Sequence, residues 1–347
     1  MSNPYSNAKD YQFWRRAVAS RASHTINPVV TPKFMLNRDT VVSTAGSCFA
    51  QHISNRLKRL GFNYYVPESG GDRSPEEKAR LNYGVFSARY GNIYTTRQLI
   101  QLVEEAYGER TPAEQAWIRK DGRYVDPYRP LVEPDGYATP DDVIAARNLH
   151  LESVRKIIER SEVFIFTLGL TEMWESKADG SAFPLAPGIS GGEYDPEKYS
   201  FRNLTFSEVI TDLEAFISKA REINPDLKIL LTVSPVPLIA TYEERNVLVS
   251  TAYSKAVLRA VAGEISDKYD FIDYFPSYEI ITGTPTGGLY YEDDLREVNA
   301  FGVSHAMCCF IGNYLPKSQV NKSLSSDFNE ALNAIVCDES ELEHARQ

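Results

Sequence analysis

The sequence predicts an α/β protein of the three-layer kind, with a parallel sheet between two layers of helices. Short apolar runs rich in β-branched and aromatic residues alternate with stretches of helical periodicity, the pattern of parallel strands joined by right-handed crossovers. The 347 residues are 43% hydrophobic and 12% aromatic, which is enough for a large core. No internal repeat or low-complexity linker divides the chain, so we expect one main domain.

The first strand–helix unit has the clearest signals. Residues 41–45 form a short β-branched run, which predicts a strand. Apolar residues then recur at helical spacing: Phe49, Ile53, Leu57 and Leu60. Gly61 is a typical helix stop, and the aromatic run 62–66 is expected to form a second strand.

The same alternation continues to the end of the domain. We expect strands at 163–168, 228–233 and 270–273, and helices at 141–160, 206–222, 243–268 and 295–315. Two stretches rich in Gly, Pro, Tyr and Arg, about 67–140 and 174–203, lack this periodicity over much of their length. They are predicted to be ordered insertions over the active-site face.

The domain limits follow from these patterns. Residues 39–316 are expected to form the α/β domain with its two insertions. Residues 1–38 are expected to be an N-terminal extension packed on the core, and residues 317–347 a polar C-terminal appendage.

Composition excludes several classes of function. The net charge of -10 and the pI near 5.2 argue against nucleic-acid binding. No apolar run reaches the roughly 20 residues of a membrane span, and the polar N-terminus carries no secretion signal. We therefore expect a cytoplasmic protein with reduced cysteines. None of the four has zinc-like Cys-x-x-Cys spacing, and adjacent Cys308 and Cys309 cannot easily form a bridge; the other two are Cys48 and Cys337. Neither a phosphate-binding glycine loop nor metal-ligand spacing occurs, so no cofactor or metal is expected.

A serine follows the first predicted strand. Ligands bind outside the carboxyl ends of the strands in an open parallel sheet, and Gly46-Ser47-Cys48 lies at such an end. In the first turn of the next helix, Ser47 would meet free N–H groups and the positive end of the helix dipole, which suit a nucleophile. Two alternatives stay open, since serine is a common helix N-cap and Cys48 is also nucleophilic.

Five ordered motifs resemble one known family over about residues 30–315. They are Gly46–Ala50 (GSCFA), Arg89–Leu99 (RYGNIYTTRQL), Phe166–Trp174 (FTLGLTEMW), Thr232–Pro237 (TVSPVP) and Tyr274–Glu279 (YFPSYE). The first is similar to the name-giving motif of the GSCFA family, a branch of the SGNH hydrolase-like superfamily. This resemblance implies a flavodoxin-like three-layer fold and, by analogy, acyl ester chemistry.

The resemblance also implies roles for residues near the expected site. Ser47 matches the nucleophile, although the aspartate that usually precedes it is absent. Gly91 of Gly91-Asn92 matches the glycine that donates an N–H group to the oxyanion, or it is an ordinary turn glycine. Gly169-x-Thr171-Glu172 stands where the superfamily has an oxyanion-binding asparagine. Thr171 can donate a hydrogen bond there, while Glu172 would orient a neighbour, bind a substrate hydroxyl or offset a helix dipole.

The general base departs from the superfamily pattern Asp-x-x-His. Asp294-x-x-Glu297 aligns with it and places a glutamate where the histidine belongs. The same residues also fit a capping box at the start of the last helix. His305 could act instead only if that helix begins later, for instance after Asn299; otherwise it is a core histidine. None of the remaining histidines is an obvious base: His24, His52, His150 and His344.

Three functions follow from these features. The leading hypothesis is an SGNH-like serine acyl esterase or acyltransferase that acts on an acylated sugar or glycan precursor, with a donor such as acyl-CoA. The second is a non-catalytic glycan-binding or scaffolding module that kept the fold without the base. The third is a transferase that uses other chemistry through the arginines and tyrosines of the insertions.

Overall fold

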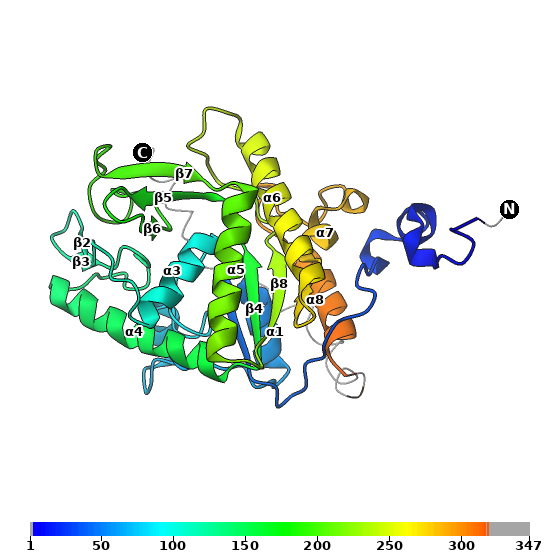
Figure 1. Ribbon diagram of the computed structural model, residues 1–347, viewed down its shortest axis with the longest axis horizontal. Coiled ribbons are helices and arrows are strands. Elements are labelled where there is room, and N and C mark those ends of the chain that lie inside the picture. The colour runs from blue at the N-terminus through cyan, green and yellow to red at the C-terminus, as the bar shows by residue number, and fades with distance from the viewer. Residues whose placement is uncertain (1–2, 317, 319–347) are drawn as a thin grey trace.

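A four-stranded parallel sheet forms the centre of the computed structural model, which describes residues 3–316 and 318 (Figure 1). Its strands lie in the order β1-β4-β8-β9. Their bounds are Val42–Gly46 (β1), Val163–Leu168 (β4), Lys228–Val233 (β8) and Ile272–Tyr274 (β9). The register pairs Gly46 with Thr167 and Thr167 with Thr232, so the carboxyl ends of the first three strands meet at one edge.

The strand predicted at 62–66 is reduced to one bridge, between Val42 and Tyr64, on the outer side of β1. Pro67 follows directly, and proline cannot donate to a sheet ladder. Other residues complete this edge, since Ser87 N–H donates to Thr44 O and Ile93 N–H donates to Gly46 O. With Tyr64 at the edge, the spatial order becomes that of a flavodoxin-like fold.

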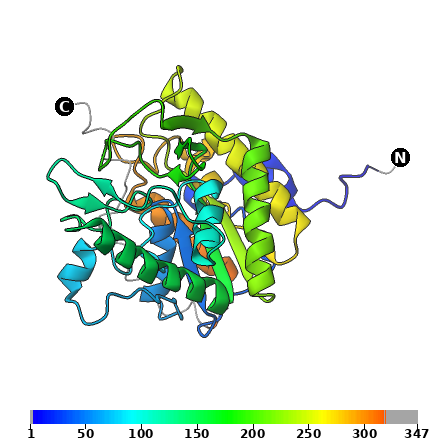
Figure 2. The same cartoon turned by 60° about the vertical axis from the view of Figure 1, so that its left-hand side comes forward.

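Helices cover both faces of the sheet and make the fold three-layered (Figures 1 and 2). One face carries α3 (Thr96–Ala106), α4 (Pro140–Arg160), α5 (Phe206–Ile223) and α6 (Val247–Lys268). The other carries α1 (Ala50–Arg59), α7 (Ser277–Thr282) and α8 (Ala300–Tyr314). A short helix, α2 (Pro75–Arg80), lies in the first insertion.

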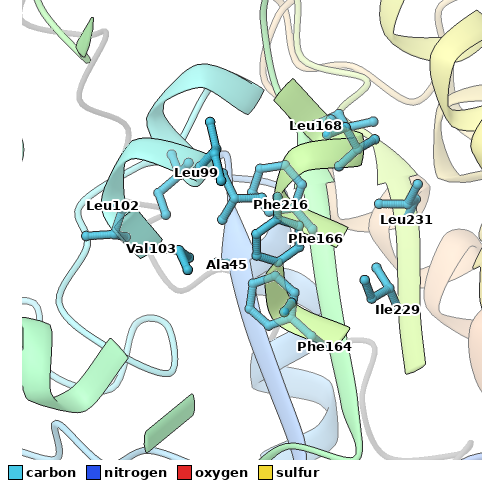
Figure 3. Packing of buried hydrophobic residues seen from close by; sticks show 14 of the residues in the cluster. Ala45, Leu99, Leu102, Val103, Phe164, Phe166, Leu168, Phe216, Ile229 and Leu231 are labelled. Carbon is cyan, nitrogen blue, oxygen red and sulfur yellow. The ribbon is translucent and has the colours of Figure 1, made fainter. Parts of the chain in front are cut away.

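Successive side chains of β4 point to opposite faces of the sheet, and each face has its own hydrophobic core. Phe164, Phe166 and Leu168 point to the α3–α6 face, where Figure 3 shows them with residues of α3, α5 and β8. Val163 and Ile165 belong to the core of the opposite face. A strand buried on both faces reads as a continuous apolar run, which is why the sequence predicts β4 correctly.

Both stretches predicted as insertions contain ordered elements and pack on one another, but α3 of the first stretch belongs to the helical layer of the core. The first contains the hairpin β2 (Trp117–Ile118) and β3 (Tyr124–Val125). The second forms an antiparallel sheet of β5 (Glu172–Ser176), β6 (Ala182–Phe183) and β7 (Tyr199–Asn203). Trp117 and Val125 share a buried cluster with Phe183 and Tyr199, so the insertions form one cover beside the sheet.

Two predicted helix starts are wrong. The sixth helix begins at Val247 rather than at residue 243, since Asn246 caps it by accepting from Leu248 N–H. The last begins at Ala300 rather than at 295, where Asn299 caps it. The residues before Asn299 form a turn in which Leu295 has a φ of +55°. Asp294-x-x-Glu297 is therefore not the capping box of this helix.

The N-terminal segment joins the α8 side of the core. Its short helical turns are η1 (Asp10–Gln12), η2 (Arg15–Ala19) and η3 (Ser23–Thr25), and a fourth, η4 (Thr284–Thr286), follows α7. Phe34 and Leu36 are buried, and Leu36 N–H donates to Tyr314 O. The predicted appendage at 317–347 lies outside the described residues except for residue 318, as do Cys337 and His344.

Candidate functional site

The candidate site begins where β1 ends. Gly46 has a φ of +130°, and a Cβ on it would lie 2.4 Å from Thr167 O, so only glycine fits between these strands. The turn directs the chain into Ser47, whose N–H donates to Thr167 O at 3.2 Å. Helix α1 starts only at Ala50, so the expectation that Ser47 lies in its first turn is wrong.

The Ser47 hydroxyl is enclosed. The residue is 2% exposed, and its Oγ has no hydrogen-bond partner among the described residues. Phe49 occupies the N-cap position of α1, and no side chain caps that helix, so the N-cap explanation for Ser47 is also wrong. Cys48 is 5% exposed and belongs to the protein interior, as expected for the position after the serine. A buried hydroxyl without a partner is costly and calls for an explanation beyond the fold.

Three segments far apart in the sequence meet around Ser47. Ile93 N–H donates to Gly46 O at 3.0 Å, which places the Gly91–Tyr94 segment beside the end of β1. The N–H groups of Gly169 and Leu170 both donate to Tyr94 O, at 3.1 and 3.0 Å. Gly91 has a φ of +68°, so this turn favours glycine for its conformation. Asn92 beside it is 1% exposed.

The next segment, Thr171 and Glu172, makes contacts away from Ser47. The Thr171 hydroxyl donates to Asn203 Oδ1 at 2.7 Å, so an oxyanion role would require this bond to break. Glu172 opens β5 rather than a helix, and the suggestion that it offsets a helix dipole is therefore wrong. Glu172 Oε1 accepts from the Thr241 hydroxyl at 2.7 Å. Burial raises the pKa of Glu172, against opposing hydrogen bonds from Thr241 and the backbone of Tyr242.

Asp294 and Glu297 lie in an exposed turn. Asp294 Oδ1 accepts from the backbone N–H groups of Arg296 and Glu297, both at 2.9 Å. Both carboxylates are exposed. Neither bonds to the Ser47 hydroxyl, because that hydroxyl has no partner in the described chain.

His305 is a buried residue of α8 with its own partners. The helix does begin after Asn299, the condition under which the sequence left His305 open as a base. However, His305 Nδ1 lies 2.8 Å from the Tyr290 hydroxyl, and the ring is edge-on to Tyr290. Burial lowers the pKa of His305, against a hydrogen bond with the backbone of Ile26. These contacts are those of a core histidine between α8 and the N-terminal segment.

Sequence reasoning missed a buried lysine beside this site. Lys255 of α6 is 1% exposed and donates to Gly169 O at 2.7 Å. Gly169 in turn packs against Ser47. A signal was available, since Lys255 lies three residues before Leu258 and seven before Ala262, on the apolar face of its helix. A lysine on such a face is unusual, because charged side chains are rarely fully buried.

A carboxylate–imidazole pair also lies near the Gly91–Tyr94 segment. His150 Nδ1 lies 2.7 Å from Glu68 Oε2, and His150 Nε2 has no partner within residues 3–316. Burial lowers the pKa of His150 to about 4, with Arg129 acting in the same direction. His150 and Asn92 line one small cavity, together with polar and apolar side chains. Across the described residues no group of three or more His, Cys, Asp or Glu side chains is placed to hold a metal ion.

The fold and the strand-end serine define a three-layer α/β protein with its candidate site at the carboxyl edge of the parallel sheet. The chain belongs to the GSCFA family, whose model matches residues 41–310. That range runs from β1 into α8 and includes every segment that meets at Ser47. No curated protein matches the chain significantly. None of the helices within the described residues is long and apolar enough to cross a membrane.

Proposed function

We propose that this GSCFA protein is a serine acyl esterase or acyltransferase of the SGNH hydrolase-like superfamily, acting on an acylated sugar or glycan precursor through Ser47. The observation that carries the proposal is the Ser47 hydroxyl, which is buried without a partner at the carboxyl end of β1. Parallel α/β sheets bind their ligands at this edge.

In the proposed reaction, Ser47 Oγ attacks the acyl carbonyl carbon while a base takes its proton. The ester bond then breaks, and the alcohol leaves with a proton. Water or an acceptor hydroxyl releases the acyl group from Ser47 in the second step, and the choice between them separates esterase from transferase. The backbone N–H of Gly91 and the Asn92 side chain support the oxyanion, and the Ser47 N–H joins them once it leaves Thr167 O.

Three groups are candidates for the base. Glu297 aligns with the histidine of the superfamily, and His305 is the alternative that a late start of α8 leaves open. Either one acts only if it moves within reach of the Ser47 hydroxyl, which has no partner in the described chain. Lys255 is the third, because it bonds to Gly169, the residue that touches Ser47. The variants Glu297→Gln, His305→Asn and Lys255→Met separate them: loss of the base lowers kcat on the order of 10²–10⁴-fold and changes the pH profile.

The nucleophile is tested with a fluorophosphonate probe and a panel of acyl esters and acyl-CoA donors. We expect labelling and turnover in the natural chain and neither in Ser47→Ala. The matched control is Ser234→Ala, because Ser234 follows β8 at the same edge, is 1% exposed and has an Oγ that accepts from Val236 N–H. Full activity in Ser47→Ala, or loss in both variants alike, overturns the proposed nucleophile.

A non-catalytic glycan-binding module is the second candidate. It is favoured by the exposed position of Glu297 and by the absence of a base bonded to Ser47 within the described residues. Saturable glycan binding by the natural chain, with no labelling and no turnover of any ester, would replace the enzyme by this module.

A further inference from the structure

A pocket of about 440 Å³ is lined by Leu170, the residue after Gly169 of the candidate site. We call it the β5 pocket. Strand β5 and the residues after β6 form one side, and the loop between β8 and α6 forms the other. Its volume lies within the range of about 300–1,000 Å³ that is typical of small-molecule sites.

Four aromatic rings make one wall of the β5 pocket. The Trp174 ring centroid lies 4.8 Å from that of Tyr242, 5.3 Å from Tyr194 and 5.8 Å from Phe201, each edge to face. Tyr242 is 61% exposed, and Tyr194 is 43% exposed. Apolar side chains form much of the remaining wall, among them Met173, Pro184, Leu185, Pro187 and Leu238.

The β5 pocket offers no positive charge to a ligand. Its lining contains no Lys, Arg or His, and Glu172 is its single carboxylate. Glu172 is engaged, since it accepts from the Thr241 hydroxyl and from the backbone of Tyr242. These bonds fix the loop that carries Tyr242 in the aromatic wall. A phosphate, nucleotide or carboxylate ligand would therefore be buried here without a counter-charge, which is unfavourable.

The β5 pocket and Ser47 are linked through one small buried cluster. Leu170 and Leu238 line the pocket, and both pack with Tyr94 in this cluster. The N–H groups of Gly169 and Leu170 donate to Tyr94 O, and Gly169 packs against Ser47. This Tyr94 cluster stands between the pocket and the enclosed hydroxyl.

We propose that the β5 pocket binds the hydrocarbon chain of an uncharged acyl ester, with the ester carbonyl directed toward Ser47. The proposal rests on the function proposed for Ser47, because it supplies the acyl part of that substrate. Side chains of the Tyr94 cluster shift as the chain enters, and this movement opens the path to the hydroxyl. Chain length is then selected by the depth of the β5 pocket.

Binding is measured in the full chain carrying Ser47→Ala, so that no ester is hydrolysed. The probes are methyl octanoate, methyl acetate and methyl glucoside, and the readout is Trp174 fluorescence, assigned with Trp174→Phe. We expect saturable binding of methyl octanoate, at least ten-fold tighter than that of methyl acetate. Ala186→Phe should weaken the binding of methyl octanoate ten-fold or more, because Ala186 lines the pocket and a phenyl ring there would occupy its space.

Two further variants keep the test decisive. Ala240→Phe fills the pocket from the opposite loop at an exposed position, in case Ala186→Phe does not fold. Leu248→Phe is the control, because Leu248 is 74% exposed on α6 and outside the pocket lining. Three outcomes overturn the proposal: methyl octanoate does not bind, both pocket-filling variants leave its binding unchanged, or methyl glucoside binds more tightly than methyl octanoate. Since Ser47 is already replaced, these outcomes are independent of whether Ser47 is the nucleophile.

Discussion

Gly169 lies so close to Ser47 that a methyl group built on its α-carbon would be 3.1 Å from the Ser47 Cβ. The same methyl group would be 3.1 Å from Tyr94 O. Most side-chain contacts are longer than this, so Ser47 or Tyr94 would have to move by a few tenths of an ångström. The absence of a side chain at position 169 therefore sets the space around the Ser47 hydroxyl.

We expect Gly169→Ala to impair the site more than the fold. If Ser47 is the nucleophile, a displacement of its side chain by a few tenths of an ångström should slow probe labelling about three-fold or more, since a misplacement of about 1 Å can cost about 10²-fold in rate. The melting temperature should fall less than in Gly46→Ala, because Gly169 has no positive φ and its new Cβ would lie 3.1 Å from its nearest neighbours, against 2.4 Å at Gly46. Gly312→Ala is the control, as a Cβ there meets no atom within 4 Å. Unchanged labelling in Gly169→Ala would show that this contact does not position Ser47.

Gly46→Ala should damage the fold itself. Its φ of +130° is one that other residues rarely adopt, and the new Cβ would lie 2.4 Å from Thr167 O. Separation of β1 from β4 is then expected, with a loss of about 3 kcal/mol or more in the free energy of unfolding. Gly61→Ala isolates the backbone contribution, because Gly61 has a φ of +70° with open space around it. This substitution should lower the free energy of unfolding by about 1 kcal/mol. Equal losses in urea denaturation would contradict the steric explanation.

The sheet could be predicted from sequence because its strands are recognisable one by one. β4 and β8 are apolar runs buried on both faces, and their preceding helices carry capping residues. The start of α8 could not be predicted in this way, because Asp294 and Asn299 are both good caps. A positive φ at Leu295 and a bridge between Tyr291 and Val298 hold Asp294 in a turn, so that it cannot cap the helix. These are tertiary features with no local signature.

The candidate site could likewise be predicted only in part. Ser47 could be found because it follows a strand in a short motif. The partners of its neighbours come from distant parts of the chain: Asn203 is 32 residues from Thr171, and Lys255 is 86 residues from Gly169. Only the packing of β5, β7 and α6 over the sheet edge brings them together. Local patterns therefore predicted where the site lies and not which groups complete it.

Acid should destabilise the protein through the half-buried His52 and the buried His150. Burial lowers the pKa of His52 to about 4, and its Nε2 has no partner among residues 3–316. Between pH 6.5 and 4 the unfolded chain binds a proton that folded His52 does not, so stability falls as pH falls. From pH 7 to pH 5, His52 should account for roughly 2 kcal/mol of that loss. His150 acts in the same sense.

The contribution of His52 is measured by comparing His52→Leu with the natural chain in urea at both pH values. The variant should lose less stability on acidification, and the difference isolates His52 from other groups, including Glu172, whose raised pKa acts in the opposite sense. Identical pH dependence in His52→Leu and the natural chain would exclude His52 as a source of acid sensitivity.

The first insertion should depend on one buried arginine. Arg129 and Asp126 are each 1% exposed and joined at 2.7 Å. Arg129 also donates to the carbonyl groups of Ala146 in α4, at 2.9 Å, and Arg89, at 3.3 Å. Arg129→Met leaves a buried carboxylate with fewer partners and should cost about 3–5 kcal/mol. Arg129→Lys, which keeps the charge without the planar fork, should lose less.

The exposed pair Arg16–Asp10 provides the matched comparison for this arginine. Its atoms lie 3.0 Å apart, but the side chains are 57% and 76% exposed. Water and salt screen such a pair, so Arg16→Ala should change the free energy of unfolding by less than about 0.5 kcal/mol. Limited proteolysis adds a local readout, because Arg129→Met should expose the insertion to cleavage before the core unfolds. Similar stability in Arg129→Met and Arg16→Ala would mean that the insertion is held by its apolar contacts, such as those of Trp117 and Val125, rather than by the buried charges.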